Sequence, residues 1–365
     1  MYIIECYFRS KIRFSYPLLR NMNPAPITKN RLTSENYTSD SNEPETLALT
    51  LPRVLSPVSQ QQVEAFLAAA TSENTRRAYR SAIRHFLAWG GLLPADETGL
   101  IRYLAEHAGS LNPRTLSLRL TALSQWHQHQ GFSDPCASPN VRKILTGIMR
   151  VHAKPKKKAR ALLIEDLERI VRYLSSQPDI KAIRNSALLQ IAFFGGFRRS
   201  ELVSLQCEYV KWESEGVSLL LPRSKTDQAG EGVLKAIPYG DDSCCPATAL
   251  QRWLKVSGID TGAIFRRIDQ WKRIGEQALH PNSVNKILAE CAAAAGLDYV
   301  PEFSSHSLRR GMATSAYRAG ASFRDIKRQG GWRFDGTVQG YIEDADQFKE
   351  NAMQSLLRTK NKSAQ

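Results

Sequence analysis

Residues 306–341 read HSLRRGMATSAYRAGASFRDIKRQGGWRFDGTVQGY, and this stretch carries four side chains at spacings that suit one chemical site. His306 and Arg309 stand three positions apart, so on a helix their side chains face the same way. Trp332 follows a pair of glycines, and Tyr341 comes nine residues after it. A histidine, an arginine, an indole and a phenol gathered in this way indicate chemistry at a phosphate.

Two further groups lie upstream of this stretch. The sequence GFRRSEL at 196–202 contains Arg198. The segments Val217–Pro222 and Gly232–Pro238 are strand-like, and the polar residues between them form a turn that contains Lys225. The sequence therefore predicts a β-hairpin with a lysine near its tip.

Together these side chains suit attack on a phosphodiester. The guanidinium groups of Arg198 and Arg309 each match two phosphate oxygens and would stabilise the charge that develops on them. His306 could take the proton of a phenol, whose ordinary pKa near 10 requires activation. Lys225 could protonate the departing 5′ oxygen, and Trp332 supplies one indole N–H donor. With so many cationic groups a divalent ion is not required, so we expect no metal and no cofactor.

Each of these residues also has a simpler explanation when it is taken alone. Arg198 would be a surface ion-pair partner, His306 a structural histidine, Trp332 a core residue and Tyr341 a packing residue. A chance match to the spacing of the four residues between 306 and 341 is on the order of one in 10⁵ per start position, at roughly 5% for each residue type. The ordered set, and no single member, carries the interpretation.

The set resembles the tyrosine recombinase (phage integrase) family. The family pattern is G-x-R-x-S-E-L, a hairpin lysine, H-x-x-R, G-G-[HW] and a tyrosine nine residues on. Every element occurs here in that order, and the resemblance covers residues 57–358. It implies a site-specific recombinase that breaks and rejoins DNA.

The resemblance also implies a role for each residue of the set. Arg198 and Arg309 would bind the scissile phosphate, and Lys225 would be the general acid. His306 would assist proton transfer. Trp332 would take the phosphate-binding place that many relatives fill with histidine.

Tyr341 would be the nucleophile and would form a 3′-phosphotyrosine bond. That bond conserves the free energy of the phosphodiester, so resealing needs no ATP. Glu201 matches an acidic position that supports the active site by orienting an arginine. Arg198 is favoured over Arg199 as the catalytic arginine, because Ser-Glu-Leu follows the motif arginine after one residue. Arg310 departs from the family pattern, since many relatives have histidine there.

The chain predicts two domains behind an irregular lead. Residues 1–55 are polar or interrupted by charge and indicate a disordered segment, with Met22 as a candidate working start. Residues 56–151 predict a helical DNA-binding bundle, 152–160 a basic linker, and 161–365 a catalytic domain. The fold class is mainly α, with a helical N-terminal bundle and an α+β catalytic domain that contains a small antiparallel sheet.

Helical periodicity and capping signals place the individual helices, the first of them after the Ser72 cap. The others are Glu97–His107, Pro113 through Trp126, Asn140–Val151, Leu163–Ser175, Ser186–Phe194, Ala247–Val256, Asn282–Ala294, Ser307–Ala319, Phe323–Gly330 and Asp344–Leu357. The last corresponds to the family's C-terminal helix, which docks into a neighbouring subunit and would make a homotetramer on two DNA sites. The alternative is that this helix docks on its own domain.

A formal net charge of +15 favours a polyanionic partner, here double-stranded DNA, although solubility alone would also explain it. The candidate DNA-binding residues are Arg76, Arg77, Arg80, Arg84, Lys156, Lys157, Asn282 and Lys286. The first four would share one helix face, the two lysines belong to the linker, and the last two open a helix whose N-terminus suits phosphate contact. Solvated helix faces and a solvated hinge remain the alternatives.

Several classes of protein are disfavoured by the composition. No run of about 18 apolar residues occurs, so we expect no membrane contact. None of the six cysteines forms a C-x-x-C pair, which argues against a zinc site and a disulfide framework. We therefore expect a reduced, cytoplasmic protein, and the resemblance to the recombinase family implies a nucleoid-associated protein of bacterial, phage or plasmid type.

Three other functions compete with the recombinase interpretation. A tyrosine topoisomerase that only relaxes DNA would use nearly the same chemistry, but the helical first domain and the C-terminal helix argue against it. A catalytically silent architectural protein would not need a tyrosine at position 341. A helix-turn-helix repressor would leave Lys225 and Tyr341 unexplained.

Overall fold

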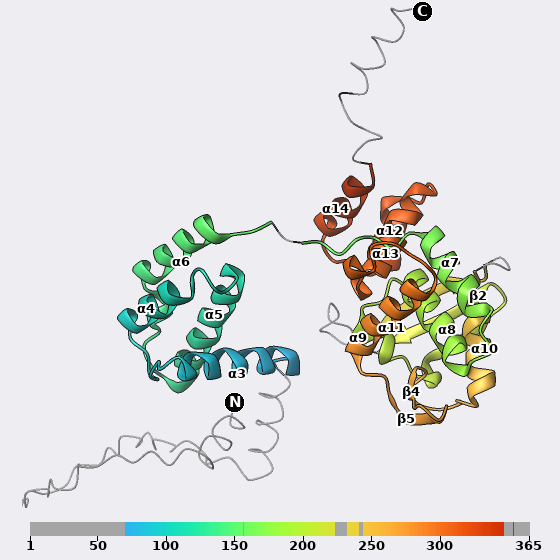
Figure 1. Ribbon diagram of the computed structural model, residues 1–365, viewed down its shortest axis with the longest axis horizontal. Helices are drawn as coiled ribbons and strands as arrows, with labels where there is room; N and C mark the ends of the chain where they lie inside the picture. Colours follow the sequence, from blue (N-terminus) through green and yellow to red (C-terminus); the bar gives the residue numbers. More distant parts are fainter. Residues whose placement is uncertain (1–69, 156, 223–231, 241–243, 347–352, 354–365) are drawn as a thin grey trace, which may run out of the picture. The chain divides into compact units, whose positions relative to one another are not determined.

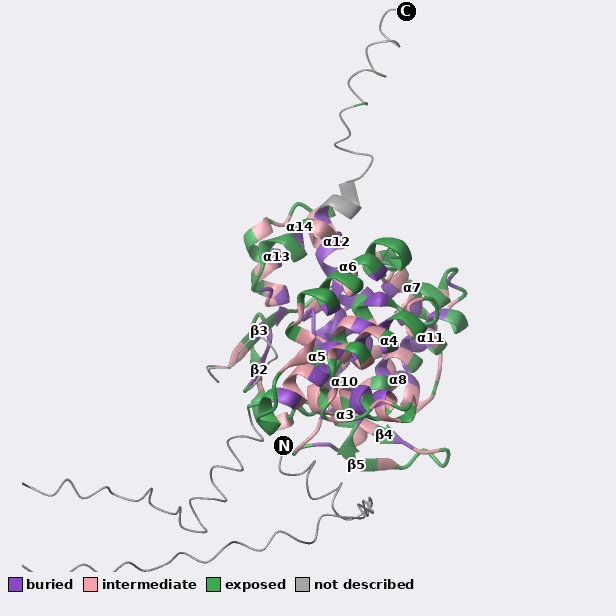
Figure 2. Ribbon diagram, turned by 90° about the vertical axis from the view of Figure 1, so that its left-hand side faces the viewer, coloured by how far each residue is buried: buried purple, intermediate pink, exposed green. Residues whose placement is uncertain are grey.

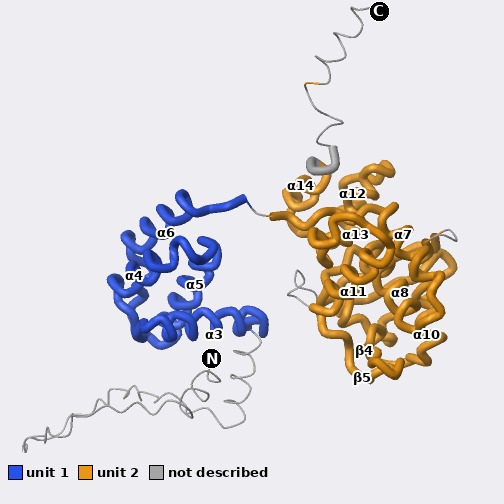
Figure 3. The backbone as a smooth tube through the Cα atoms, viewed as in Figure 1, with its two compact units in different colours: residues 1–155 blue, residues 156–365 orange. Residues whose placement is uncertain are grey.

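The computed structural model describes residues 70–155, 157–222, 232–240, 244–346 and Met353. The described chain is mainly helical and contains small antiparallel sheets, as the sequence predicts. It forms two compact units that divide between Pro155 and Lys156 (Figure 3). The division falls within residues 152–160, the segment that the sequence marks as a basic linker.

The secondary structure described in the first unit is all helical (Figure 1). Its elements are α3 (Glu73–Ala88), α4 (Glu97–His107), α5 (Pro113–Gln130), η1 (Pro135–Ala137) and α6 (Pro139–His152). Side-chain caps fix where the helices begin: Ser72 accepts from the Thr75 amide at 3.2 Å, and Asp96 accepts from the Gly99 amide at 2.8 Å. Such a cap is worth about 1 kcal/mol, because it satisfies an amide that has no partner inside the helix.

One apolar face of each helix supplies the core of this unit. The fully buried side chains include Phe86, Leu100, Tyr103, Leu104, Leu116 and Leu123. Buried and exposed residues occur along the same helices (Figure 2). The predicted bounds of α4 are confirmed, and α5 continues to Gln130, beyond the predicted Trp126.

The second unit mixes helices with two small sheets. Its elements are α7 (Ile164–Ser175), α8 (Ile180–Phe194), α9 (Arg199–Val203), η2 (Cys207–Tyr209), β1 (Val210–Glu213), β2 (Gly216–Leu221), β3 (Val233–Pro238), α10 (Pro246–Ser257), β4 (Arg266–Ile268), β5 (Ile274–Ala278), α11 (Pro281–Ala294), η3 (Val300–Glu302), α12 (Ser305–Arg318), α13 (Phe323–Gly330) and α14 (Asp335–Asp346). No helix among the described residues is long and apolar enough to cross a membrane.

The two predicted hairpin strands, β2 and β3, belong to a three-stranded sheet with the order β1-β2-β3, in which β2 is the central strand. Strands β2 and β3 pair antiparallel, with Val217 opposite Ile237. Their bounds agree with the predicted segments to within one residue, but Lys225 lies outside the described residues. Strand β1 and the β4–β5 pair were not predicted. Most of their side chains are exposed, so they lack the alternation that signals a half-buried strand.

Helix α8 is largely buried, and the predicted start at Ser186 was wrong, because the helix begins at Ile180. Polar residues in its first turns conceal the helical pattern. Arg184 is buried in the structure, where its guanidinium donates to Asn185 Oδ1 at 2.7 Å and to the Arg266 carbonyl at 3.3 Å. Tertiary contacts therefore satisfy a charged side chain that a sequence pattern places outside.

Helices α12, α13 and α14 lie together at one end of this unit (Figure 1). The predicted bounds of α13 are confirmed. The last helix begins at Asp335, nine residues before the predicted Asp344, so Tyr341 lies within it. Gly336 and Gly340 lower its helix propensity, but Val338 is fully buried and anchors it. Residues 347–352 and 354–357 of the predicted helix lie outside the described residues.

Candidate active site

A sharp turn between α8 and α9 presents the first arginine. Gly196 has φ +56°, and a Cβ there would approach Met312 Cε to 2.5 Å, so only glycine suits this position. Arg198 follows at the N-cap of α9. Its backbone amide donates to Glu201 Oε2 at 2.9 Å, and its Nη1 donates to Glu201 Oε1 at 2.5 Å. Glu201 is buried, so one carboxylate fixes both the backbone and the side chain of Arg198.

The neighbouring Arg199 is exposed and does not line the pocket described below, whereas Arg198 does. The position of Ser-Glu-Leu in the sequence had favoured Arg198 for the same role. The short helix α9, which the sequence did not predict, explains why Arg198 and not Arg199 lines the pocket. Arg198, the N-cap residue, turns toward the site, and Arg199, the first helical residue, turns away.

The start of α12 carries the histidine and the second arginine. Ser304 caps this helix by accepting from the His306 amide at 3.3 Å. The Ser305 amide donates to Asn285 Oδ1 of α11 at 2.8 Å, which ties the two helices together. His306 is exposed at the pocket, and Arg309 lies one helical turn further in.

Arg309 is only 3% exposed. Its Nη1 donates to the Gly196 carbonyl, while Nη2 is buried and has no hydrogen-bond partner among the described residues. Burial, and next the charge of Arg198, lower the pKa of Arg309 to about 10, so the guanidinium remains protonated at neutral pH. A buried, charged N–H group without a partner is expensive, and an anion in the pocket would satisfy it.

The turn after α13 places the tryptophan. Gly331 adopts φ +63°, and its amide donates to the carbonyls of Lys327 and Arg328, which ends the helix in a left-handed cap. Trp332 then folds back into the unit and is 8% exposed. The Arg309 guanidinium lies 4.3 Å from the centre of its ring, close enough for a cation–π interaction.

Tyr341 projects from α14 toward the same place. Its ring meets the Trp332 ring edge-on, with 5.7 Å between the ring centres and 65° between the planes. The Arg310 guanidinium lies 5.3 Å from the centre of the Tyr341 ring. The Arg310 guanidinium therefore lies against the ring of the candidate nucleophile.

One pocket of about 190 Å³ collects these side chains. It is lined by Arg198, His306, Arg309, Trp332, Arg333, Phe334, Thr337 and Tyr341. Five of the six predicted catalytic residues thus meet in one place, although more than 140 positions separate the first from the last. The sixth, Lys225, lies outside the described residues.

A profile of the phage integrase family matches residues 160–347, more than half of the chain. The chain belongs to the phage integrase family. It is 33% identical over 299 residues to the integrase/recombinase xerD homolog of Selenomonas ruminantium, covering 80% of this chain and 87% of the relative. It is also 26% identical to recombinase cre of Escherichia phage P1, covering 79% of this chain and 89% of that protein.

The fold agrees with that of lambda integrase, solved as a tetramer bound to a Holliday junction. The TM-score is 0.52 at 17% identity, and the match covers 78% of this chain and 76% of the other. The family membership and the named relatives identify this phage integrase as a tyrosine site-specific recombinase. The fold class that the sequence predicts is thereby confirmed.

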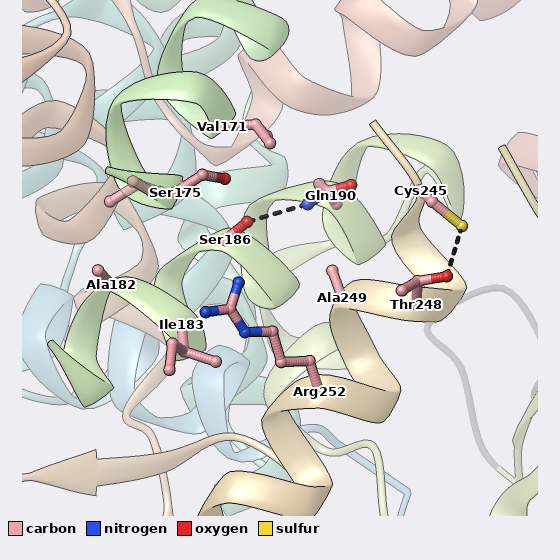
Figure 4. Close-up of a pocket in the computed structure, with 11 residues that line it drawn as sticks. Val171, Ser175, Ala182, Ile183, Ser186, Gln190, Cys245, Thr248, Ala249 and Arg252 are labelled. Atoms are coloured by element: carbon pink, nitrogen blue, oxygen red, sulfur yellow. Dashed lines mark hydrogen bonds between the residues drawn. The ribbon is translucent and has the colours of Figure 1, made fainter. Parts of the chain in front are cut away.

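A second pocket in this integrase, of about 140 Å³, lies between α7, α8 and α10 (Figure 4). Within it Gln190 donates to Ser186 Oγ at 2.9 Å, and the Cys245 thiol lies 3.1 Å from Thr248 Oγ1. Among its lining residues only Arg252 carries a charge. It therefore lacks the converging cations of the first pocket, which is the better site for a phosphate.

Lys235 on β3 is a functional candidate that the sequence interpretation missed. Its side chain is 3% exposed, and burial, followed by the charge of Arg309, lowers its pKa to about 7. The signal was present in the strand itself: Lys235 stands in phase with the buried Ile237, while Leu234 and Ala236 are exposed. Arg333 and Thr337 on the pocket rim were also missed, because nothing in their spacing marks them.

The candidate DNA-binding residues lie on polar faces. On α3, Arg76 and Arg80 pair with Glu73 at 2.9 and 2.6 Å, and Arg77 and Arg84 are exposed. On α11, Asn282 and Lys286 are exposed, and Lys286 lies 3.7 Å from Glu290. Lys157 is exposed near the start of the second unit, and Lys156 lies outside the described residues.

Proposed function

We propose that this recombinase cleaves double-stranded DNA with Tyr341 and holds the scissile phosphate between Arg198 and Arg309. The observation that carries this assignment is the buried Nη2 of Arg309, which has no partner among the described residues and belongs to the pocket that also contains Tyr341. A phosphodiester oxygen would satisfy it with a charge-assisted hydrogen bond.

In the proposed reaction the Tyr341 phenol oxygen attacks phosphorus, and the bond between phosphorus and the 5′ oxygen breaks. The phenol proton passes to a base, for which His306 is the candidate, and Lys225 would protonate the 5′ oxygen. Arg198 and Arg309 hold the developing charge on the non-bridging oxygens. The 3′-phosphotyrosine keeps the energy of the broken bond, so a 5′ hydroxyl can reverse the step.

Two residues support this arrangement without reacting. Glu201 orients Arg198 through the two hydrogen bonds described above. Trp332 lies between Arg309 and Tyr341, and its indole N–H would donate to a phosphate oxygen. No metal enters this scheme, because the cations of the site supply the charge stabilisation.

For DNA binding we propose the exposed basic faces of both units. Arg76, Arg77, Arg80 and Arg84 on α3, the lysines Lys156 and Lys157, and Asn282 and Lys286 on α11 would contact the duplex backbone. Their positive charge and the excess of +15 for the chain support this assignment, since phosphate neutralisation releases counterions. We place the reaction in the cytoplasm, where the thiols of Cys136, Cys207, Cys245 and Cys291 would stay reduced.

We also propose a homotetramer on two DNA sites, joined through the C-terminal segment 344–357. The support is the shared fold with lambda integrase, whose solved form is a tetramer on a Holliday junction. Sedimentation on a synthetic four-way junction should give four protein chains per junction for the full chain. A chain truncated after Asp346 should fail to reach that stoichiometry. Four chains per junction from both proteins would contradict the role of the segment.

The decisive experiment uses a suicide DNA substrate that is nicked beside a candidate site and incubated in EDTA. Wild type and Tyr341→Phe are run side by side on a denaturing gel. We expect a protein–DNA band from wild type alone, with equal gel shifts for the two proteins on the same DNA. An equal band from Tyr341→Phe would remove Tyr341 from the reaction. Binding without any band would favour an architectural protein that has kept only the DNA contacts.

A further inference from the structure

Lys235 on β3 is hydrogen-bonded to the end of α13, just before the turn that carries Trp332. Its Nζ donates to the carbonyl of Gln329, two residues before Gly331. The Gln329 side chain in turn donates to the Ala236 carbonyl at 3.1 Å and to the Phe194 carbonyl at 2.9 Å. The end of α13 is therefore held on β3 from both sides, and Lys235 supplies the one charged contact in this set.

The surroundings of Lys235 are unusual for a buried lysine. No ion pair joins it to a carboxylate among the described residues, although buried lysines are normally paired. The charged groups that act on it are Arg309 from α12, and Arg198 and Glu201 from α9. From the other elements it meets the Gln329 carbonyl of α13 and the Phe197 ring, whose centre lies 5.5 Å from Nζ.

Three cations thus share one buried carboxylate, Glu201. The cluster therefore has an excess of positive charge, which a bound phosphodiester would neutralise. We propose that Lys235 is a positioning residue of the active site, a buried ammonium that fixes the Trp332 turn and backs Arg198 and Arg309 in holding the scissile phosphate. This inference rests on the proposed function of the pocket.

The proposal predicts that phosphate binding is linked to proton uptake. In the DNA-free protein the pKa of Lys235 is about 7, and a nearby anion raises the pKa of an ammonium. Below pH 7 the lysine is already charged, so the phosphate takes up no proton. Above pH 7 the free lysine is neutral, and binding then requires a proton. Affinity for the charged phosphate should fall with rising pH, by at most about tenfold for each pH unit.

The test compares two duplexes that differ only at the scissile position, one with the natural phosphodiester and one with an uncharged methylphosphonate. Affinities are measured from pH 6.5 to 9 in a Tyr341→Phe background, which prevents cleavage. For the parent protein we expect the preference for the charged duplex to fall at least fivefold between pH 7 and pH 9. With Lys235→Met the preference should be smaller at pH 7 and flat over the range, since methionine has similar volume and no charge.

Lys235→Arg should restore the preference and keep it flat, because arginine stays charged throughout. Lys211→Met is the matched control: Lys211 lies on β1 of the same sheet with its side chain 76% exposed, and its loss should leave the parent profile unchanged. All residues other than 235 are the same in these variants, so their contributions cancel in the comparison. Thermal melting of each variant verifies folding, and Lys235→Arg provides the comparison if Lys235→Met does not fold.

A pH profile of Lys235→Met that matches the parent would overturn the role of Lys235, as would a flat parent profile. If the methylphosphonate changes affinity in no variant at any pH, the phosphate does not occupy this pocket and the Lys235 proposal fails with it. The suicide-substrate gel reports separately on Tyr341. Failure of the nucleophile assignment is thereby distinguished from failure of the Lys235 assignment.

Discussion

At the level of single residues, the orientation of Arg198 depends on one buried carboxylate. Glu201→Gln keeps the shape of the side chain but removes its charge and turns an amide N–H₂ toward the guanidinium. We expect cleavage of the suicide substrate to slow by about ten- to a hundredfold, which corresponds to roughly 1.4–2.7 kcal/mol of lost transition-state stabilisation. Single-turnover rates at saturating protein measure this effect.

Glu215→Gln is the matched control, because Glu215 is exposed in the turn between β1 and β2. That variant should cleave at the wild-type rate. Wild-type cleavage by Glu201→Gln would show that Arg198 needs no carboxylate to orient it.

The pKa of Lys235 also predicts how stability depends on pH in the DNA-free protein. The folded pKa of about 7 lies below the ordinary lysine value, so between pH 7 and about 10 the unfolded chain binds more protons. The contribution of this residue to stability is therefore lowest below pH 7 and rises with pH, by up to about 5 kcal/mol in total.

Urea unfolding from pH 6 to 10 tests this prediction when wild type is compared with Lys235→Met. The difference in unfolding free energy, wild type minus variant, should increase as the pH rises. The cysteines Cys136 and Cys291, whose pKa values burial raises to about 12 and about 11, are present in both proteins and cancel. A constant difference would contradict the lowered pKa.

At the level of elements, the left-handed cap of α13 positions Trp332. Gly331→Ala would force a Cβ into a backbone conformation with φ +63°, at about 1–2 kcal/mol of strain. A Cβ there would also lie 3.6 Å from Lys235 Nζ. We expect a melting temperature several degrees lower and cleavage at least tenfold slower, because the turn moves Trp332 relative to Arg309.

Gly320→Ala controls for the strain alone. Gly320 also has a positive φ, +89°, but a Cβ there meets nothing within 4 Å and the residue does not line the pocket. Its melting temperature should fall by a similar amount, while its cleavage rate should stay close to wild type. Equal loss of cleavage in both variants would attribute the effect to stability instead of to Trp332.

Elements with a local signal were predictable, and the others were not. Helices α4 and α13 have the expected bounds because caps and glycine stops act within one turn. The first turns of α8 were missed, because Arg184 is polar and becomes buried only through contact with β4. Strand β1 and the β4–β5 pair were missed because their partners, and not their own side chains, make them strands.

At the level of the whole molecule, the positive charge predicts a strong salt dependence of DNA binding. The double variant Lys156→Gln/Lys157→Gln removes two proposed phosphate contacts of the basic linker, residues 152–160. We expect the slope of log K against log salt concentration to become shallower by about 2. The slope is measured by gel shift or fluorescence titration at salt concentrations between about 50 and 300 mM.

The double variant Lys211→Gln/Lys255→Gln has the same change of charge on exposed lysines of β1 and α10. It should keep the wild-type slope, because a distant charge is screened at these salt concentrations. Equal slopes for all three proteins would remove Lys156 and Lys157 from the DNA contacts.

The sequence by itself determined the mainly helical fold class and the family, because the spacing of His306, Arg309, Trp332 and Tyr341 is a local property of the chain. It also marked Arg198 and the acidic position Glu201. Only the tertiary structure placed Arg198 and Tyr341 in one pocket, and only it brought Arg309, Arg198 and Glu201 close to Lys235. The reason is physical: the spacing of residues is a property of the sequence alone, whereas the desolvation that shifts a pKa depends on neighbours that folding brings from distant positions.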